Sequence, residues 1–143
     1  MSSLRYLPLI GRLLIGLPFM MSGIIKIMGS DATIALIQSS TLPLPAPLAY
    51  IGAFAVEIGC GLLIMLGYHT RIVAAVFAVF CLATAVFFHA DFADPNQTFH
   101  FIKNIIMTGG LLQIVANGAG AFSIDNRRSK QGVEAGSTPP GSE

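Results

Sequence analysis

Residues 48–89, LAYIGAFAVEIGCGLLIMLGYHTRIVAAVFAVFCLATAVFFH, decide the fold. They contain two apolar runs, Leu48–Gly67 and Ile72–His89, which are joined by the short turn Gly67-Tyr68-His69-Thr70. Each run approaches the ~20 residues that an α-helix needs to cross a bilayer. Because the turn is so tight, the two runs are predicted to form antiparallel helices that lie side by side.

Two further apolar runs, Tyr6–Met28 and Phe99–Asn117, flank this hairpin. Of the 143 residues, 54% are hydrophobic and 10% are charged, and the mean hydropathy is +0.74. The net charge of +1 gives no basic footprint for nucleic acid. We therefore predict an all-α integral membrane protein, a four-helix bundle. Its first run is expected to remain as a transmembrane helix, because no signal-peptide cleavage pattern follows it.

The segments outside the apolar runs contain helix-breaking residues. Residues 31–47 can begin as a short helix, but they end in Leu42-Pro43-Leu44-Pro45-Ala46-Pro47, where proline removes N–H donors and fixes φ. We expect this segment to lie at the membrane interface or to re-enter the bundle. Residues 126–143 are rich in Gly, Ser, Pro and charge, so a disordered cytoplasmic tail is expected after a membrane domain of residues 1–125.

Basic residues are unevenly distributed among the connecting regions. Three regions that share one side in a four-span chain contain Arg5, Arg12, Arg71, Arg127, Arg128 and Lys130. The loops of the opposite side contain Asp31, Asp91 and Asp94. The positive-inside rule therefore predicts that both termini are cytoplasmic.

Ionisable side chains inside the apolar runs are the candidates for function. A charge in hydrocarbon costs roughly 3 kcal/mol or more unless it is paired or hydrated. Helical spacing places Arg12 and Lys26 on one face of the first run, and His100, Lys103 and Asn104 on one face of the fourth. We expect a polar cluster just under the outer surface, made of Lys26, His89, His100, Lys103 and Asn104.

Glu57 is expected deeper, near the middle of the membrane. It can pair with Arg12 in an ion pair that fixes helix register, or reach a lysine, or act as a proton-accepting carboxylate. The two lysines can instead extend to the interface, and the histidines can be ordinary interfacial residues. Cys60 and Cys81 fit small buried hydrophobes better than a redox pair.

The chemistry of the cluster favours an electron-rich ligand. Its positive balance suits an anion or the carbonyl oxygens of a quinone, and imidazole can exchange the accompanying proton near neutral pH. A metal site is disfavoured, because the histidines lack close ligand spacing and the lysines would repel a cation.

Four stretches of the chain together resemble the DoxX family of small four-helix bacterial membrane proteins, over about Gly11 to Asp125. They are Gly11-Arg12-Leu13-Leu14 with Ser22-Gly23-Ile24-Ile25-Lys26; Leu42-Pro43-Leu44-Pro45; Val56-Glu57 with Leu66-Gly67 and Thr70-Arg71; and Phe99-His100-Phe101-Ile102-Lys103-Asn104 with Gly109-Gly110-Leu111-Leu112. The positions that match the shared pattern are Arg12, Lys26, Glu57, His100, Lys103 and Asn104. The resemblance implies a multi-pass protein of the bacterial inner membrane. Family members are often described as oxidoreductases, and some are linked to quinone-dependent sulfur oxidation or to complexes with redox enzymes.

The resulting hypothesis is a redox-associated membrane subunit that binds a quinone or a small sulfur species beside a partner oxidoreductase. Catalytic roles are expected for Glu57, His100 and Lys103, and ligand contacts for Arg12, Lys26, His89 and Asn104. Lys26, Lys103 and His100 would stabilise negative charge on the ligand, while Glu57 manages the proton. The alternatives are a transporter of ions or small molecules, which would need a homo-oligomer to form a path, and a scaffold whose charges only fix packing.

Overall fold

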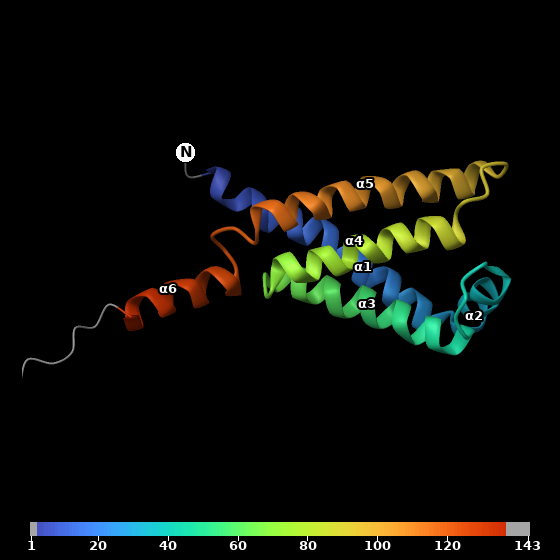
Figure 1. The fold of residues 1–143 in the computed structure, drawn as a ribbon, viewed down its shortest axis with the longest axis horizontal. Helices are drawn as coiled ribbons and strands as arrows, with labels where there is room; N and C mark the ends of the chain where they lie inside the picture. Colours follow the sequence, from blue (N-terminus) through green and yellow to red (C-terminus); the bar gives the residue numbers. More distant parts are fainter. Residues whose placement is uncertain (1–2, 137–143) are drawn as a thin grey trace, which may run out of the picture.

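The computed structural model describes residues 3–136, which form one short 3-10 helix and six α-helices (Figure 1). These elements are η1 (Ser3–Tyr6), α1 (Leu7–Met28), α2 (Ser30–Ser39), α3 (Ala46–Leu66), α4 (Thr70–Phe88), α5 (Pro95–Asn117) and α6 (Ile124–Gly136). The described residues contain no strand, so the all-α prediction is confirmed.

Four of the helices are long and apolar enough to cross a membrane, which confirms the predicted number of spans. They are α1 with the preceding η1 turn, α3, α4 and α5. The largest shift of a boundary is at α5, which begins at Pro95 rather than at Phe99. Asp94 explains the earlier start, because its side chain accepts the backbone N–H of Asn96 and so caps the helix ahead of the proline.

The spans form two closely packed pairs, α1 with α3 and α4 with α5, which α3 and α4 join (Figure 1). Small residues allow the first pair to approach closely: a Cβ added at Gly16 would lie 2.7 Å from the carbonyl oxygen of Gly61. The core between the pairs contains Phe19, Ile64, Val73, Ala74, Phe77, Ala78, Cys81 and Leu111. Many apolar side chains on the outer surfaces of the spans stay exposed, as a lipid-facing surface requires.

Helix α2 and the proline-containing segment lie at the end of the bundle opposite the N-terminus (Figure 1). The helix ends at Ser39, a few residues before the first proline, and its Ile37 is buried. The short helix expected before the prolines is therefore present, and it packs against α3.

The turn between α3 and α4 is the anchor for the C-terminal part of the chain. Gly67 is left-handed (φ 69°), its N–H donates to Ile64 O at 3.1 Å, and the N–H of Tyr68 donates to Leu63 O at 3.1 Å. This pattern is a Schellman motif, which satisfies carbonyls at the helix end. His69 then adopts a left-handed conformation as well (φ 46°).

Asp125, near the start of α6, joins this turn through both of its carboxylate oxygens. Oδ1 accepts the N–H of His69 at 2.8 Å, and Oδ2 accepts the N–H and the hydroxyl of Thr70 at 2.9 and 2.7 Å. The N–H of Asp125 donates to Gly67 O at 2.9 Å. Asp125 thus supplies acceptors for the first turn of α4 and attaches α6 to the bundle.

The sequence predicts disorder from residue 126 onward, and residues 126–136 differ from that prediction because they belong to α6. The anchor at Asp125 starts the helix, and the guanidinium of Arg128 lies 5.4 Å from the centre of the Tyr68 ring, within cation–π range. Residues 137–143 of the predicted tail lie outside the described residues.

The anchor at Asp125 should weaken in acid. Partial burial raises the pKa of Asp125, but the hydrogen bonds from Thr70 and His69, together with the electrostatic effect of His69, outweigh it and hold the pKa below the ordinary value of a carboxyl group. Because the folded pKa is lowered, the stabilisation is complete above the ordinary pKa of a carboxyl and is lost as pH falls through the lowered value. Amide NMR of the protein in micelles should show His69 and Thr70 resonances shifting in that range. In D125N, the amide resonances of His69 and Thr70 should already lie at neutral pH where the wild type shows them in acid. If they stay at the wild-type chemical shifts, the anchor is contradicted.

Candidate functional site

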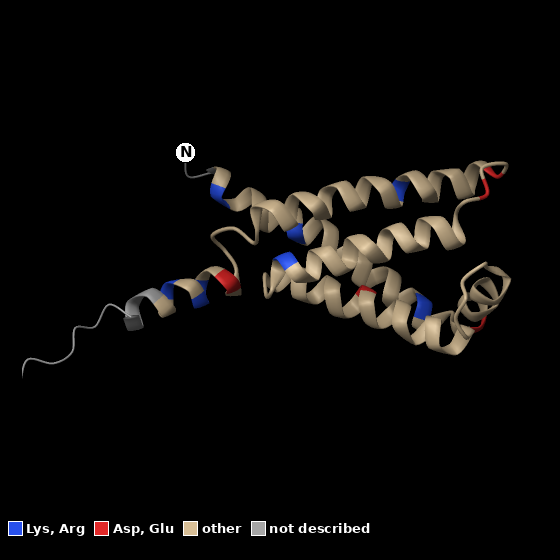
Figure 2. Ribbon diagram, viewed as in Figure 1, with Lys and Arg blue, Asp and Glu red and all other residues tan. Residues whose placement is uncertain are grey.

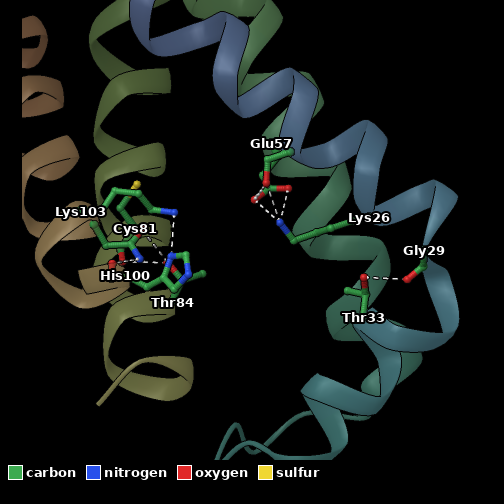
Figure 3. A network of polar contacts seen from close by, with 10 residues as sticks. Lys26, Gly29, Thr33, Glu57, Cys81, Thr84, His100 and Lys103 are labelled. Carbon is green, nitrogen blue, oxygen red and sulfur yellow. Dashed lines mark hydrogen bonds and ion pairs between the residues drawn. The ribbon is translucent and has the colours of Figure 1, made fainter. Parts of the chain in front are cut away.

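Lys26 and Glu57 form a bidentate ion pair between α1 and α3 (Figure 3). Lys26 Nζ lies 2.8 and 2.9 Å from the two carboxylate oxygens of Glu57 and also donates to Ser22 Oγ at 2.8 Å. The carboxylate is buried, while the lysine side chain is 29% exposed. The positive charge of Lys26 and the negative charge of Glu57 neutralise each other, which lowers the cost of placing both inside a membrane span.

The prediction that Glu57 can reach a lysine is confirmed, and the alternative prediction that it pairs with Arg12 is wrong. Arg12 and Lys26 share a face of α1, but they are about 21 Å apart along the helix at 1.5 Å per residue. Because α1 and α3 are antiparallel, only the end of α1 that carries Lys26 lies within reach of Glu57.

Arg12 instead binds backbone carbonyls at the opposite end of the bundle. Its guanidinium donates to Ile64 O and Met65 O, both at 3.2 Å, and to Phe122 O. The side chain is 1% exposed. Helix ends leave carbonyls without intrahelical partners, and a cation there also interacts favourably with the helix dipole. Arg12 therefore joins the end of α3 to the segment before α6, and the structure does not bring it to the other candidate residues.

His89, His100 and Lys103 form a second polar group, around the end of α4 and the first turns of α5. We call it the histidine–lysine cluster. Lys103 Nζ lies 3.1 Å from His100 Nδ1, and the His89 and His100 rings stack with centroids 5.0 Å apart. His89 Nδ1 lies 2.7 Å from Gln97 Oε1. Since an ammonium group only donates, its hydrogen bond assigns the imidazole proton of His100 to Nε2.

Asn104 positions α5 against α4 beneath this cluster. Its amide nitrogen donates to His100 O at 3.0 Å, and its oxygen accepts the hydroxyl of Thr84 at 3.3 Å. The residue is buried. Sequence reasoning missed Thr84, Ser22 and Gln97 as polar partners. Ser22 could have been found, because it lies one helical turn before Lys26.

The two polar groups lie on different helix pairs and face each other (Figure 3). Within residues 3–136, no hydrogen bond or ion pair joins Lys26 to the histidine–lysine cluster. The predicted convergence is therefore correct for His89, His100, Lys103 and Asn104, while Lys26 belongs to the pair with Glu57.

The histidine–lysine cluster is rich in donors and carries an uncompensated charge. Lys103 lies eight residues into α5, about 12 Å along the helix from its first residue. The single salt bridge in the described part of the chain is Lys26–Glu57, so Lys103 has no acidic partner there. Its remaining N–H groups and the Nε2–H of His100 can donate to an electron-rich ligand.

Both cysteines are free thiols in the structure. Cys81 is fully buried in the core between the helix pairs, and the half-buried Cys60 packs against the same core. Among the described residues, no three His, Cys, Asp or Glu side chains gather as ligands for a metal ion.

The Lys26–Glu57 pair should behave as a unit. Glu57→Leu leaves a lysine without its counter-ion inside the span, which should cost about 3–5 kcal/mol of unfolding free energy. The double variant K26M/E57L removes both charges and should recover most of that loss. Unfolding of the purified protein by titration with a denaturing detergent measures the difference, and Asp31→Asn on exposed α2 is the control for loss of an acid. Equal destabilisation of the single and double variants would show that the pairing does not matter.

Comparison with known proteins agrees with this architecture. The DoxX family model matches residues 7–90. "Inner membrane protein YphA" of Escherichia coli (strain K12) is 36% identical over 142 residues, which cover 89% of this chain and 100% of that protein. "Inner membrane protein YqjF" of the same strain is 35% identical over 124 residues, which cover 86% of this chain and 92% of that protein. No solved structure matches. Together with its four apolar helices, these relatives support a multi-pass inner-membrane protein, and the chain belongs to the DoxX family.

Proposed function

We propose that this protein is a redox-associated membrane subunit, which binds the oxygen-bearing headgroup of a quinone or a small anionic sulfur species at the histidine–lysine cluster. The observation that carries the proposal is the position of Lys103. This ammonium group lies within a membrane span, beside a neutral His100 and without an acidic partner in residues 3–136.

An uncompensated cation in a span is costly, and a ligand that brings negative charge or carbonyl oxygens removes that cost. Lys103 keeps further N–H donors beyond its contact with His100, and His100 keeps its Nε2–H as a donor for such a ligand. The stacked His89 ring holds His100 in place, and its own Nδ1 is engaged by Gln97. The arrangement therefore favours an acceptor ligand over a cation.

The Lys26–Glu57 pair faces the same space from the other helix pair (Figure 3). In this proposal Glu57 exchanges the proton that accompanies electron transfer, while Lys26 holds the carboxylate in place through contacts with both of its oxygens. The electrons come from a partner oxidoreductase, which docks on the membrane-embedded subunit.

Ligand binding should depend on Lys103. Purification in mild detergent, followed by mass spectrometry of the organic extract and of the co-purified proteins, should reveal a stoichiometric quinone or sulfur species, or an attached oxidoreductase. Lys103→Met should reduce ligand occupancy about ten-fold or more, because a hydrogen bond to a charged group contributes about 1.5–3 kcal/mol. His100→Phe should have a similar effect, since it removes the Nε2–H donor.

Gln113→Met is the matched control, because Gln113 is an exposed polar residue of the same helix whose partner is Asn117. Each variant is first tested for wild-type thermal unfolding, so that loss of ligand is not confused with loss of fold. Unchanged occupancy in folded Lys103→Met would overturn the site. A preparation with bulk lipid alone would favour the scaffold.

We further propose that both termini are cytoplasmic. Lys and Arg gather at the end of the bundle where η1 and α6 lie, and Asp residues gather at the loops of the opposite end (Figure 2). In a background without native cysteines, a cysteine at Ser129 should resist a membrane-impermeant maleimide in intact spheroplasts, while one at Asp91 should react. The reverse labelling pattern would invert the topology.

A further inference from the structure

A hollow of about 570 Å³ lies at the end of the bundle away from the proposed ligand site. It lies between the first turn of α4, the segment that follows α5, and the start of α6. Its walls include Arg71, Ile72, Gly118, Asn126 and Ser129. The volume is within the range of small-molecule sites, about 300–1,000 Å³.

Arg71 is the cation of this hollow. It is exposed, and among residues 3–136 it takes part in no salt bridge. Its guanidinium lies over the backbone of Gly118, where an added Cβ would lie 3.3 Å from Nε of the arginine. Gly118 also has a positive φ of 80°, which other residues rarely adopt, so glycine keeps the backbone turned and leaves room for the guanidinium.

The acidic residue that lines the hollow is already committed elsewhere. Both carboxylate oxygens of Asp125 accept hydrogen bonds from the turn, from the N–H of His69 and from the N–H and hydroxyl of Thr70. The carboxylate thus satisfies the start of α4, while Arg71 is left for another anion. Asn126 and Ser129 add polar groups to the wall.

Below the hollow, α4 presents an apolar stripe to the membrane. Ile72 lines the hollow and is 65% exposed, and Val76 and Val79 follow it on the same face with exposures of 49% and 67%. The hollow therefore lies where a polar anion site continues directly into a surface suited to hydrocarbon chains.

We propose that this hollow binds one anionic phospholipid. Its phosphate contacts the guanidinium of Arg71, and its acyl chains run along the stripe of Ile72, Val76 and Val79. The exposed cations of the first turns of α6, Arg127, Arg128 and Lys130, lie within about 9 Å of the start of that helix along its axis and add to the local positive potential. A free phosphate would use the guanidinium but not the stripe, so the stripe is what favours a lipid.

Native mass spectrometry of the full-length protein in mild detergent tests the proposal, with titration of phosphatidylglycerol and phosphatidylcholine. The wild type should bind phosphatidylglycerol about ten-fold more tightly, and Arg71→Gln should abolish that preference, because it removes a charge-assisted contact. Arg5→Gln is the matched control, since Arg5 is an exposed arginine at the same end of the bundle but does not line the hollow.

Ser129→Trp is a second variant, which should fill the hollow while Arg71 stays in place and should also abolish the preference. Glycerol phosphate, which has the headgroup chemistry but no acyl chains, should not compete with the lipid. Equal loss in Arg5→Gln and Arg71→Gln would indicate diffuse surface charge and overturn the site. An unchanged preference in both hollow variants, or full competition by glycerol phosphate, would overturn it as well.

Discussion

The burial of one guanidinium, that of Arg12, organises the end of the bundle where α3 ends and α6 begins. Arg12 is inside the protein, so it must find acceptors, and it takes them from the last turn of α3 and from the segment that leads into α6. The guanidinium packs directly against the backbone of Gly67. Only glycine fits there, because any side chain would collide with Arg12 and with Ser123. The same turn receives Asp125. Thus α1, α3, α4 and α6 meet at one buried charge and its neighbouring carboxylate.

The polar groups at the other end are divided between the two helix pairs in an unequal way. The α1–α3 pair holds a cation and an anion that neutralise each other, whereas the α4–α5 pair holds a cation beside two imidazoles. The space between the pairs is therefore positive on balance. Such an imbalance has no packing advantage in hydrocarbon, and the proposed ligand site rests on it.

Hydropathy alone predicted the four spans, because lipid demands long apolar helices and leaves little choice of structure. Helical spacing also placed His100, Lys103 and Asn104 correctly on one face of α5. It could not choose between Arg12 and Lys26 for Glu57, since both lie on the same face of α1 and the choice depends on how far α1 and α3 slide past each other. Helix α6 was missed because its composition is polar, and a tertiary contact through Asp125 attaches it.

The pairing of α1 with distant parts of the chain has a consequence for how the protein is made. Lys26 has no counter-ion until the ribosome has synthesised Glu57, 31 residues later, and Arg12 acquires its last carbonyl only from Phe122, 110 residues downstream. Helix α1 is therefore made before these partners of its two cations exist, and it must remain in a hydrated or protein-lined environment while the rest is translated. Final burial of α1 is therefore a late step of biogenesis, because α1 is synthesised before the segments that supply Glu57 and Phe122.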